Sequence, residues 1–371
     1  KLFDKQSLRD AMNTIYKAGI KGKLYRLWYN LNQKTRIGGQ TAFGNSSYKE
    51  CGETVAQGSL GGAIVSAANL DDGIQQFFKE SEHEVCYGQV QLKPLLYQDD
   101  IIRATTTVSG AQNGLTKIWN LMNLKLLDIN AEKSSHLIVS DGDKLQNIQD
   151  EISRSPLQYN NNLIKENDKE KWLGDVFHKS GLEASIEATI KDRLGRTKIA
   201  IFETNSILDD TRMQIIGGIH GAINIWEIAV IPALLNNCET WTDICDDDIT
   251  ELENLQFLFV RTMLQVPESC PKAALLWETG LMLMKFRVMK KKLIFCKYIQ
   301  QCDDNYLAKE IYVEQERLKL PGLVKECNTL AKELNIDNDF NDTKVTLNRF
   351  KAIVKQKISA QNEKELRSMM S

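Results

Sequence analysis

Two adjacent carboxylates, Asp99 and Asp100, follow Tyr97 and Gln98 in a stretch flanked by apolar and β-branched residues. Like charges this close repel each other, so a site that keeps both ionised usually supplies a cation. Mg²⁺ suits the pair because it is a hard ion that takes carboxylate and phosphate oxygens together, and Mn²⁺ accepts the same ligands. Two such ions about 4 Å apart, with a third carboxylate, could activate a hydroxyl and stabilise a leaving pyrophosphate. The alternative is a solvated turn, in which Asp-Asp is common.

Three further short motifs flank the acidic pair along the chain. Gly58 permits close approach of the backbone to a ligand, and Gln57 offers an amide to a sugar or a base. Lys133 could neutralise phosphate charge or donate a proton to a leaving group. The last of these stretches along the chain is Trp172-Leu173-Gly174. Each signal is weak by itself, so the information lies in their order along the chain.

The residues up to about 180 predict the helices and strands that would position these motifs. Apolar residues at three-to-four spacing predict two helices over 4–31, broken near Gly19 to Gly22, and another helix over 63–78. β-prone residues predict a hairpin over 34–55 and a second hairpin that carries Asp99 and Asp100 at its tip. A helix over 110–126 and strands over 135–139 and 172–177 complete an α+β unit.

The remainder of the chain is predicted to be nearly all helical. Periodic apolar residues indicate helices over 183–204, 211–236, 247–264 and 279–299, followed by a more polar helical region over 300–371. We therefore predict three parts, which are 1–180, 181–265 and 266–371. The run Asp246-Asp247-Asp248 precedes an apolar helical stretch and fits the first turn of a helix better than a metal site.

Composition excludes several classes of protein. The 47 basic and 49 acidic residues leave a net charge of −2, which argues against a polycationic arm. The eight cysteines show no C-x-x-C pair, so neither a zinc knuckle nor a dense disulfide scaffold is expected. No apolar stretch approaches the roughly 20 residues that cross a bilayer, and no signal peptide is visible. We expect an intracellular protein, in the nucleus or the cytoplasm, with no membrane partner.

Local charge favours a nucleic-acid partner more than the net charge does. Residues 1–50 hold ten Lys/Arg and three Asp/Glu, a composition suited to phosphate contact. Aromatic side chains that could stack on bases are interleaved with them: Tyr16, Tyr25, Trp28 and Tyr29. A solvated face over aromatic core residues is the alternative, because these aromatics fall on helical spacing. A second basic cluster, over 285–292, is more typical of an amphipathic packed helix than of a binding patch.

Taken in order, the motifs resemble those of the reverse transcriptases of non-LTR (LINE-like) retrotransposons. The resemblance covers roughly residues 1–265 and runs from the end of the first palm motif, through the fifth, into the thumb. The matching stretches are Phe3-Asp4-Lys5, Gln57-Gly58-Ser59, Tyr97-Gln98-Asp99-Asp100, Asn130–Ser134, Trp172-Leu173-Gly174, and Ile231–Leu235 with Glu239-Thr240-Trp241. Five ordered motifs are far more specific than any one of them.

The resemblance implies an α+β fold with a right-hand polymerase palm, in which helices pack on an antiparallel sheet, followed by a helical thumb and a helical carboxy-terminal region. The implied activity is RNA-directed DNA polymerisation, the transfer of a nucleotide from a dNTP to the 3′-hydroxyl of a DNA primer on an RNA template. Mg²⁺ is the implied cofactor, with Mn²⁺ as a substitute.

The same resemblance implies roles for individual residues. Asp99 and Asp100 would be the metal ligands and, with Lys133 facing the triphosphate, the catalytic residues. Gln57 and Gly58 would contact the incoming nucleotide and the template. Phe3 would stand where the family places the side chain that excludes a ribose 2′-hydroxyl. The primer end would be positioned by Trp172, Leu173 and Gly174.

The sequence departs from the family pattern at several positions. The metal-binding Asp of the first motif would fall three positions before Lys1, and Asp4 is a poor substitute because it follows Phe3. The chain as given is therefore expected to lack polymerase activity. Gln98 stands where Ala is commonest, and Leu60-Gly61-Gly62 replaces the firmer turn that many relatives have.

Two other functions stay open at the level of sequence. One is a non-catalytic nucleic-acid-binding protein that keeps the palm and thumb fold. The other is a helical interaction protein in which Asp99-Asp100 is only a turn. The oligomeric state and the role of 266–371 are not predicted.

Overall fold

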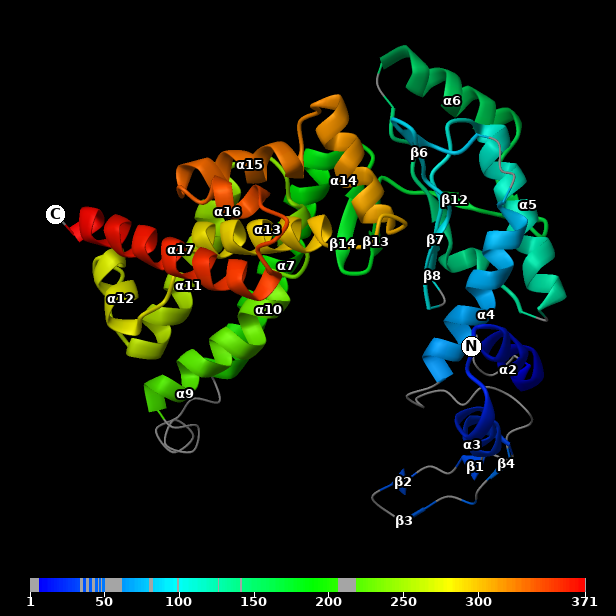
Figure 1. Ribbon diagram of the computed structural model, residues 1–371, viewed down its shortest axis with the longest axis horizontal. Helices are drawn as coiled ribbons and strands as arrows, with labels where there is room; N and C mark the ends of the chain where they lie inside the picture. The colour runs from blue at the N-terminus through cyan, green and yellow to red at the C-terminus, as the bar shows by residue number, and fades with distance from the viewer. Residues whose placement is uncertain are drawn as a thin grey trace. The chain divides into compact units, whose positions relative to one another are not determined.

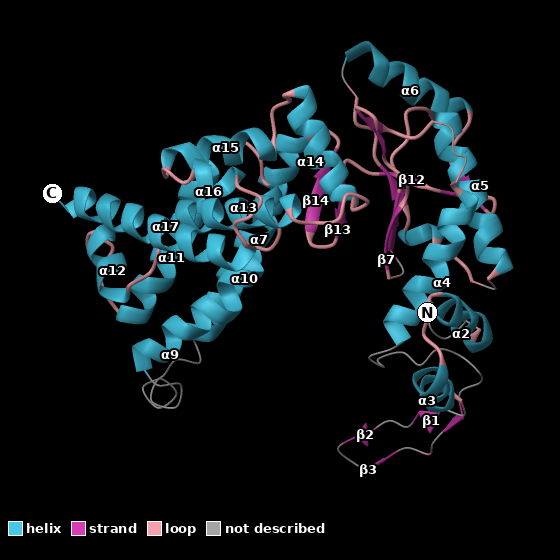
Figure 2. Cartoon of the chain, in the orientation of Figure 1, coloured by secondary structure: helices cyan, strands magenta, loops and turns pink. Residues whose placement is uncertain are grey.

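The computed structural model divides into two compact units, residues 1–168 and 169–371 (Figure 1). It describes residues 7–33, 36–37, 40–41, 44–45, 47, 49–50, 62–79, 83–98, 100–125, 127–140, 142–205 and 218–370. Helices predominate and the strands are short (Figure 2). The chain is therefore α+β and mostly helical.

The first unit begins with the two helices expected on either side of a glycine break. They are α2 (Leu8–Lys17) and α3 (Gly22–Asn32). Ser7 caps α2, because its hydroxyl accepts a hydrogen bond from the Asp10 amide at 3.4 Å. Gly19 and Gly22 both have positive φ, 98° and 68°, which explains why the chain turns there. The inner face of α2 forms a small core with aromatic residues of α3: Leu8, Ala11, Met12, Ile15, Tyr25, Trp28 and Tyr29.

Short antiparallel ladders occupy the segment where a hairpin was predicted over 34–55. Strand β1 (Arg36–Ile37) pairs with β4 (Lys49–Glu50), and β2 (Gln40–Thr41) pairs with β3 (Gly44–Asn45). The β2–β3 pair lies between β1 and β4 in the sequence, as expected when two chain segments run antiparallel to each other. The predicted hairpin is therefore confirmed.

A second core of the first unit lies around α4 (Gly62–Phe77) and α5 (Val108–Leu124), which contact each other. Thr107 caps α5 by accepting a hydrogen bond from the Gly110 amide at 3.0 Å. Phe78 is fully buried in this core, together with apolar residues of both helices. Asn69 is buried on α4 and accepts from Lys125 Nζ at 2.7 Å, which ties the end of α5 to α4.

The remaining elements of the first unit are strand pairs and one amphipathic helix. The antiparallel pairs are β5 (Cys86–Tyr87) with β6 (Val90–Gln91), β7 (Leu95–Tyr97) with β8 (Asp100–Ile102), and β10 (Gln158–Tyr159) with β11 (Asn162–Leu163). The pair β9 (Ser135–His136) with β12 (Lys165–Glu166) is parallel. A 3₁₀ turn, η1 (Ala131–Lys133), precedes β9, and α6 (Gly142–Arg154) follows it.

All strands of the described ranges pair only in twos and are two to four residues long. Strands this short lie at or below the lower end of the usual range, and Pro94, directly before β7, cannot donate to a ladder. The continuous antiparallel sheet of a palm therefore stays a prediction.

The second unit begins with a hairpin rather than with a helix. Strands β13 (Lys169–Trp172) and β14 (Asp175–His178) pair with each other, and β14 packs on α7 (Leu182–Asn205). The Val176 amide donates to Thr189 Oγ1 at 2.8 Å, and the His178 amide donates to Ser185 Oγ at 2.8 Å. Because these bonds tie the hairpin to the helix, the division between the units falls at 168/169, ahead of the position near 180 that the change of pattern suggested.

The rest of the second unit is helical and shares one hydrophobic core that extends from Ile186 to Leu366. The core therefore includes residues of both 181–265 and 266–371. Of the helix predicted over 211–236, residues 211–217 lie outside the described part. The elements in order are α9 (Gly218–Ile225), the π-helix η2 (Trp226–Val230), α10 (Ile231–Leu234), η3 (Cys238–Thr240), α11 (Asp246–Leu264), α12 (Lys272–Thr279), α13 (Met284–Gln300), α14 (Leu307–Leu318), α15 (Leu323–Glu333), α16 (Asp337–Asn341) and α17 (Leu347–Met370).

Two sequence predictions about charged residues in this unit are confirmed. The run Asp246-Asp247-Asp248 forms the first turn of α11, where acids complement the helix dipole. The basic cluster lies on α13, which packs in the core, and its Lys292 is only 1% exposed and pairs with Glu326. No helix of the described ranges is long and apolar enough to cross a membrane.

Candidate functional site

The tight turn between β7 and β8 carries the acidic motif. Tyr97 and Asp100 are the last opposed pair of the ladder, and Gln98 follows Tyr97 at the end of β7. Gln98 has φ 56°, the left-handed conformation that such turns require. Tyr97 and Asp100 are both exposed, while Asp99 lies outside the described residues. The predicted hairpin is confirmed, and it presents Asp100 to solvent beside its turn.

A buried ion pair anchors the chain directly after β8. Arg103 Nη2 lies 3.1 Å from Glu84 Oε1, and the two side chains are 9% and 0% exposed. The same guanidinium donates from Nη1 to the Gly110 carbonyl of α5 at 2.7 Å and covers the ring of Phe78. The backbone of Glu84 also forms an isolated antiparallel β-bridge with that of Thr105. The orientation of the acidic hairpin therefore depends on a charge pair that the sequence motifs do not indicate.

Lys133 lies at the end of η1 and is exposed. Asn130 caps this turn, because its Oδ1 accepts from the Glu132 amide at 3.1 Å. The Lys133 amide donates to the Asn130 carbonyl at 3.1 Å, and within the described residues its side chain forms no hydrogen bond or ion pair. The predicted nucleotide-contacting residues Phe3, Gln57 and Gly58 lie outside the described part of the chain, as Asp99 does.

The motif Trp172-Leu173-Gly174 forms the turn between β13 and β14. Leu173 and Gly174 have φ values of 51° and 91°, so both central positions of this two-residue turn are left-handed. The ring of Trp172 packs against Phe177 at 6.4 Å between centroids. Trp172 Nε1 is buried and has no hydrogen-bond acceptor among the described residues. Glycine suits position 174 because a residue without a Cβ adopts a positive φ without steric strain.

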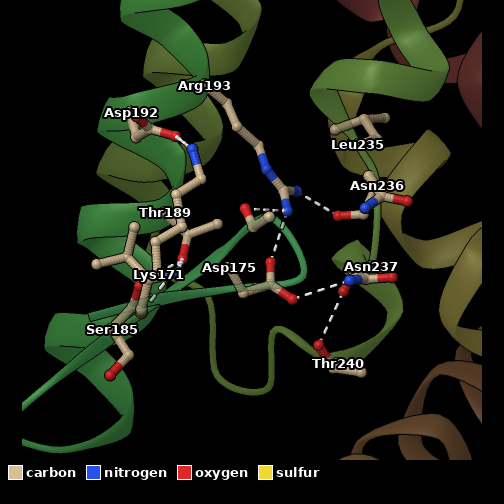
Figure 3. Close-up of polar contacts among 12 residues, drawn as sticks. Lys171, Asp175, Ser185, Thr189, Asp192, Arg193, Leu235, Asn236, Asn237 and Thr240 are labelled. Atoms are coloured by element: carbon tan, nitrogen blue, oxygen red, sulfur yellow. Dashed lines mark hydrogen bonds and ion pairs between the residues drawn. The ribbon is translucent and has the colours of Figure 1, made fainter. Parts of the chain in front are cut away.

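The side chain of Arg193, from α7, extends toward this turn and toward Asn236 (Figure 3). Its Nη2 donates to the Gly174 carbonyl at 3.1 Å and to Asp175 Oδ1 at 2.5 Å. Its Nη1 donates to the carbonyls of Asn236 and Leu234. The Arg193 side chain is only 5% exposed. Burial lowers the pKa of Arg193, and the nearby Asp175 carboxylate raises it again.

Asp175 and Asn237 extend the same network toward the 231–241 stretch. Asn237 Nδ2 donates to Asp175 Oδ2 at 2.9 Å, and Thr240 Oγ1 donates to the Asn237 carbonyl at 2.8 Å (Figure 3). Asn237 has φ 54°, which suits its small polar side chain. The Arg193 guanidinium also lies 5.3 Å from the centroid of the Trp241 ring. The network thus connects the Trp172-Leu173-Gly174 turn with the 231–241 stretch, which are separate motifs in the sequence.

In comparisons with known proteins, no family model matches the chain and no curated protein matches it significantly. The family resemblance therefore rests on the ordered motifs themselves.

The acidic turn offers hard oxygen ligands to a cation. Asp100 is the predicted metal ligand that the structure describes, and its carboxylate, exposed beside the turn, suits Mg²⁺. No group of three His, Cys, Asp or Glu side chains that could hold a metal comes together in the described ranges. A complete centre would thus need Asp99 and a third carboxylate.

Sequence motifs did not identify Arg193, Glu84 or Arg103. One feature of the sequence could have indicated Arg193. It follows Ile190 by three positions, so it falls on the apolar face of α7. A charged residue on such a stripe must be paired, but its partners cannot be read from the helix alone.

Proposed function

We propose that this chain is the palm and thumb of a non-LTR retrotransposon reverse transcriptase and that it binds a DNA primer on an RNA template. The observation that carries the proposal is the β7–β8 hairpin, in which Asp100, of the sequence motif Tyr97-Gln98-Asp99-Asp100, is exposed opposite Tyr97. A catalytic carboxylate needs an exposed placement of this kind, because a metal ion and a triphosphate must both reach it. Such a protein would act in the nucleus or the cytoplasm.

In this function Asp99 and Asp100 would hold Mg²⁺, or Mn²⁺ in its place. The ion, when bound, supplies positive charge that stabilises the triphosphate and the attacking 3′-hydroxyl. Exposed Lys133 would pair with phosphate oxygens of the dNTP. Phe3, Gln57 and Gly58 would contact the nucleotide, and the turn of Trp172, Leu173 and Gly174 would contact the primer end. Arg193 would hold that turn against the thumb helices, which makes it a positioning residue.

The first experiment measures binding of a labelled RNA-template and DNA-primer duplex by the 371-residue chain at several salt concentrations. We expect binding that weakens steeply with salt, because contacts to phosphates release counterions. A folded chain that fails to bind the duplex at low salt would overturn the proposal and favour the helical interaction protein.

The second experiment measures Mg²⁺-dependent dNTP incorporation by the natural open reading frame that encodes the chain. We expect a loss of about 100-fold or more in Asp99→Asn and Asp100→Asn, because each removes a charged metal ligand. Asp128→Asn is the matched control, since Asp128 is an exposed acid of the same unit and outside the motif. Duplex binding without any incorporation would instead identify a non-catalytic nucleic-acid-binding protein.

A further inference from the structure

A pocket of about 710 Å³ lies within the second unit, where α13 and the start of α17 face the segment from α9 to α10. Its apolar wall includes Ile231, Leu281, Phe295 and Leu347. This volume is in the range of pockets that bind small molecules, roughly 300–1,000 Å³. The pocket is separate from the turn that Arg193 clamps.

The π-helix η2 shapes one wall of the pocket. Ile223, Glu227, Ile231 and Leu235 all line it at four-residue spacing. In an α-helix, positions four apart drift around the axis because a turn takes about 3.6 residues. The wider π turn over Trp226–Val230 offsets that drift, so these residues stay on one line. The π-helix therefore keeps Glu227 on the side of the helix that faces the pocket.

The basic residues of the pocket outnumber its acids, four to two. Arg287 is neutralised by Glu227, to which Nη1 donates at 2.8 Å and Nη2 at 2.5 Å. Lys291 donates to the Leu235 carbonyl at 2.6 Å and lies 3.5 Å from Glu239. Both acids are thus engaged by two of the cations.

Lys290 and Lys351 are the two cations that remain. Within the described ranges neither makes an ion pair or a side-chain hydrogen bond. Lys290 is half-buried and Lys351 is exposed at the rim of the pocket. Burial lowers the pKa of Lys290, Lys355 and Arg287 lower it further, and Glu227 raises it. Two excess positive charges next to an apolar wall form a site that an anion would stabilise.

One acceptor in the pocket also lacks a donor. Glu239 Oε2 is buried and accepts no hydrogen bond from the described part of the chain, although Lys291 is at ion-pair distance. A hydroxyl or N–H group of a bound molecule could satisfy this oxygen.

We propose that this pocket binds an organic anion that has an apolar or aromatic body. The anionic group pairs with Lys290 and Lys351, and the body packs against Ile231, Phe295 and Leu347. A donor group on the molecule bonds Glu239. This site is distinct from the proposed polymerase chemistry and does not depend on it.

The experiment compares two fluorescent probes that differ in charge, 8-anilinonaphthalene-1-sulfonate and neutral N-phenyl-1-naphthylamine, on the whole chain. The anionic probe is expected to bind at least about tenfold more tightly, because only it can pair with the lysines. In Lys290→Met with Lys351→Met, anion binding falls about tenfold and neutral-probe binding stays within twofold. The control Lys325→Met with Lys332→Met removes two exposed charges of α15 that do not line the pocket.

Two outcomes would overturn the proposal. One is an anion affinity that changes less than twofold in the double variant, and the other is an equal fall for both probes. A third variant, Leu347→Trp, fills the pocket and is expected to reduce binding of both probes while the chain stays folded by circular dichroism. Unchanged binding of both probes in Leu347→Trp would also contradict the site.

Competition distinguishes the sources of such an anion. Displacement of the anionic probe by laurate indicates an acyl carboxylate, and displacement by deoxyadenosine monophosphate indicates a nucleotide; either result supports the pocket. Displacement by a nucleic-acid duplex alone, dependent on both lysines, would overturn it, because the lysines would then contact a phosphate backbone and not a pocket ligand.

Discussion

Arg193 Nη2 donates a hydrogen bond to the backbone carbonyl of Gly174 at 3.1 Å, so a helix side chain holds the turn of the hairpin that precedes it. The other terminal nitrogen of the same guanidinium donates to the Asn236 carbonyl. One buried cation thus fixes two stretches of backbone that are far apart in the chain. The local geometry of the Trp172-Leu173-Gly174 motif should therefore depend on this side chain.

Replacing Arg193 by Lys should destabilise the second unit by about 2–4 kcal/mol, because an ammonium cannot reach both backbone segments and leaves buried carbonyls unpaired. The free energy of unfolding in urea, followed by tryptophan fluorescence, measures this loss. Arg196→Lys is the control, since Arg196 is exposed and pairs only locally with Asp192. A loss below about 0.5 kcal/mol in Arg193→Lys would show that the network is not structural.

Local elements followed from the sequence because their signals act within a few residues. The break between α2 and α3 falls at Gly19 and Gly22, as the glycines indicated, and the hairpin at Gln98 lies between apolar strands. Short-range spacing also predicted the first turn of α11. These signals need no knowledge of tertiary contacts.

Long-range partners could not be predicted in the same way. Arg193 gave no sign that it would pair with Gly174 and Asn236, because the partners are backbone carbonyls of distant turns. Likewise, nothing local indicated that Arg103 would pair with Glu84 across the base of the acidic hairpin. Such pairs depend on how the elements pack, which a single sequence specifies only indirectly.

Lys297→Met should destabilise the second unit by about 2–4 kcal/mol. Lys297 is fully buried on α13, and its ammonium donates to the carbonyls of Asp339, Phe340 and Asp342 at 3.2, 2.8 and 2.8 Å. The substitution keeps much of the stem volume but removes the ammonium donor from the Asp339 and Phe340 carbonyls, while the Asp342 carbonyl keeps the Val345 amide at 3.1 Å. Urea unfolding checks the loss, and Lys332→Met, at an exposed position, should change stability by less than about 0.5 kcal/mol.

Two glycine substitutions should have opposite effects. Gly114→Ala places a methyl group against the Arg103 guanidinium, which is held by Glu84, and should cost about 1–3 kcal/mol. Gly195→Ala lies in exposed mid-helix with open space around it and should gain about 0.5–1 kcal/mol. Amide hydrogen exchange should become faster in α5 of the first variant and slower in α7 of the second. The same direction of change in both would contradict the steric argument.

Glu253 should make the stability of the second unit depend on pH. Its side chain caps α13 from α11, because Oε1 accepts from the Met284 amide, and it is only 8% exposed. Burial raises the pKa of Glu253 from 4.5 to about 7, against the backbone hydrogen bonds and nearby Arg287, which lower it. Between these two values the folded state holds a proton that the unfolded state has released.

The free energy of unfolding should therefore fall as the pH rises from about 4.5 through 7, by about 3 kcal/mol at most. Glu253→Gln cannot ionise, so its stability relative to the natural chain should rise by about 2–3 kcal/mol between pH 4.5 and pH 8. Glu251→Gln, an exposed position of the same helix, is the control and should show no such trend. Urea unfolding across this pH range measures both, and parallel pH profiles for Glu253→Gln and the natural chain would mean that Glu253 is ionised in the folded state throughout.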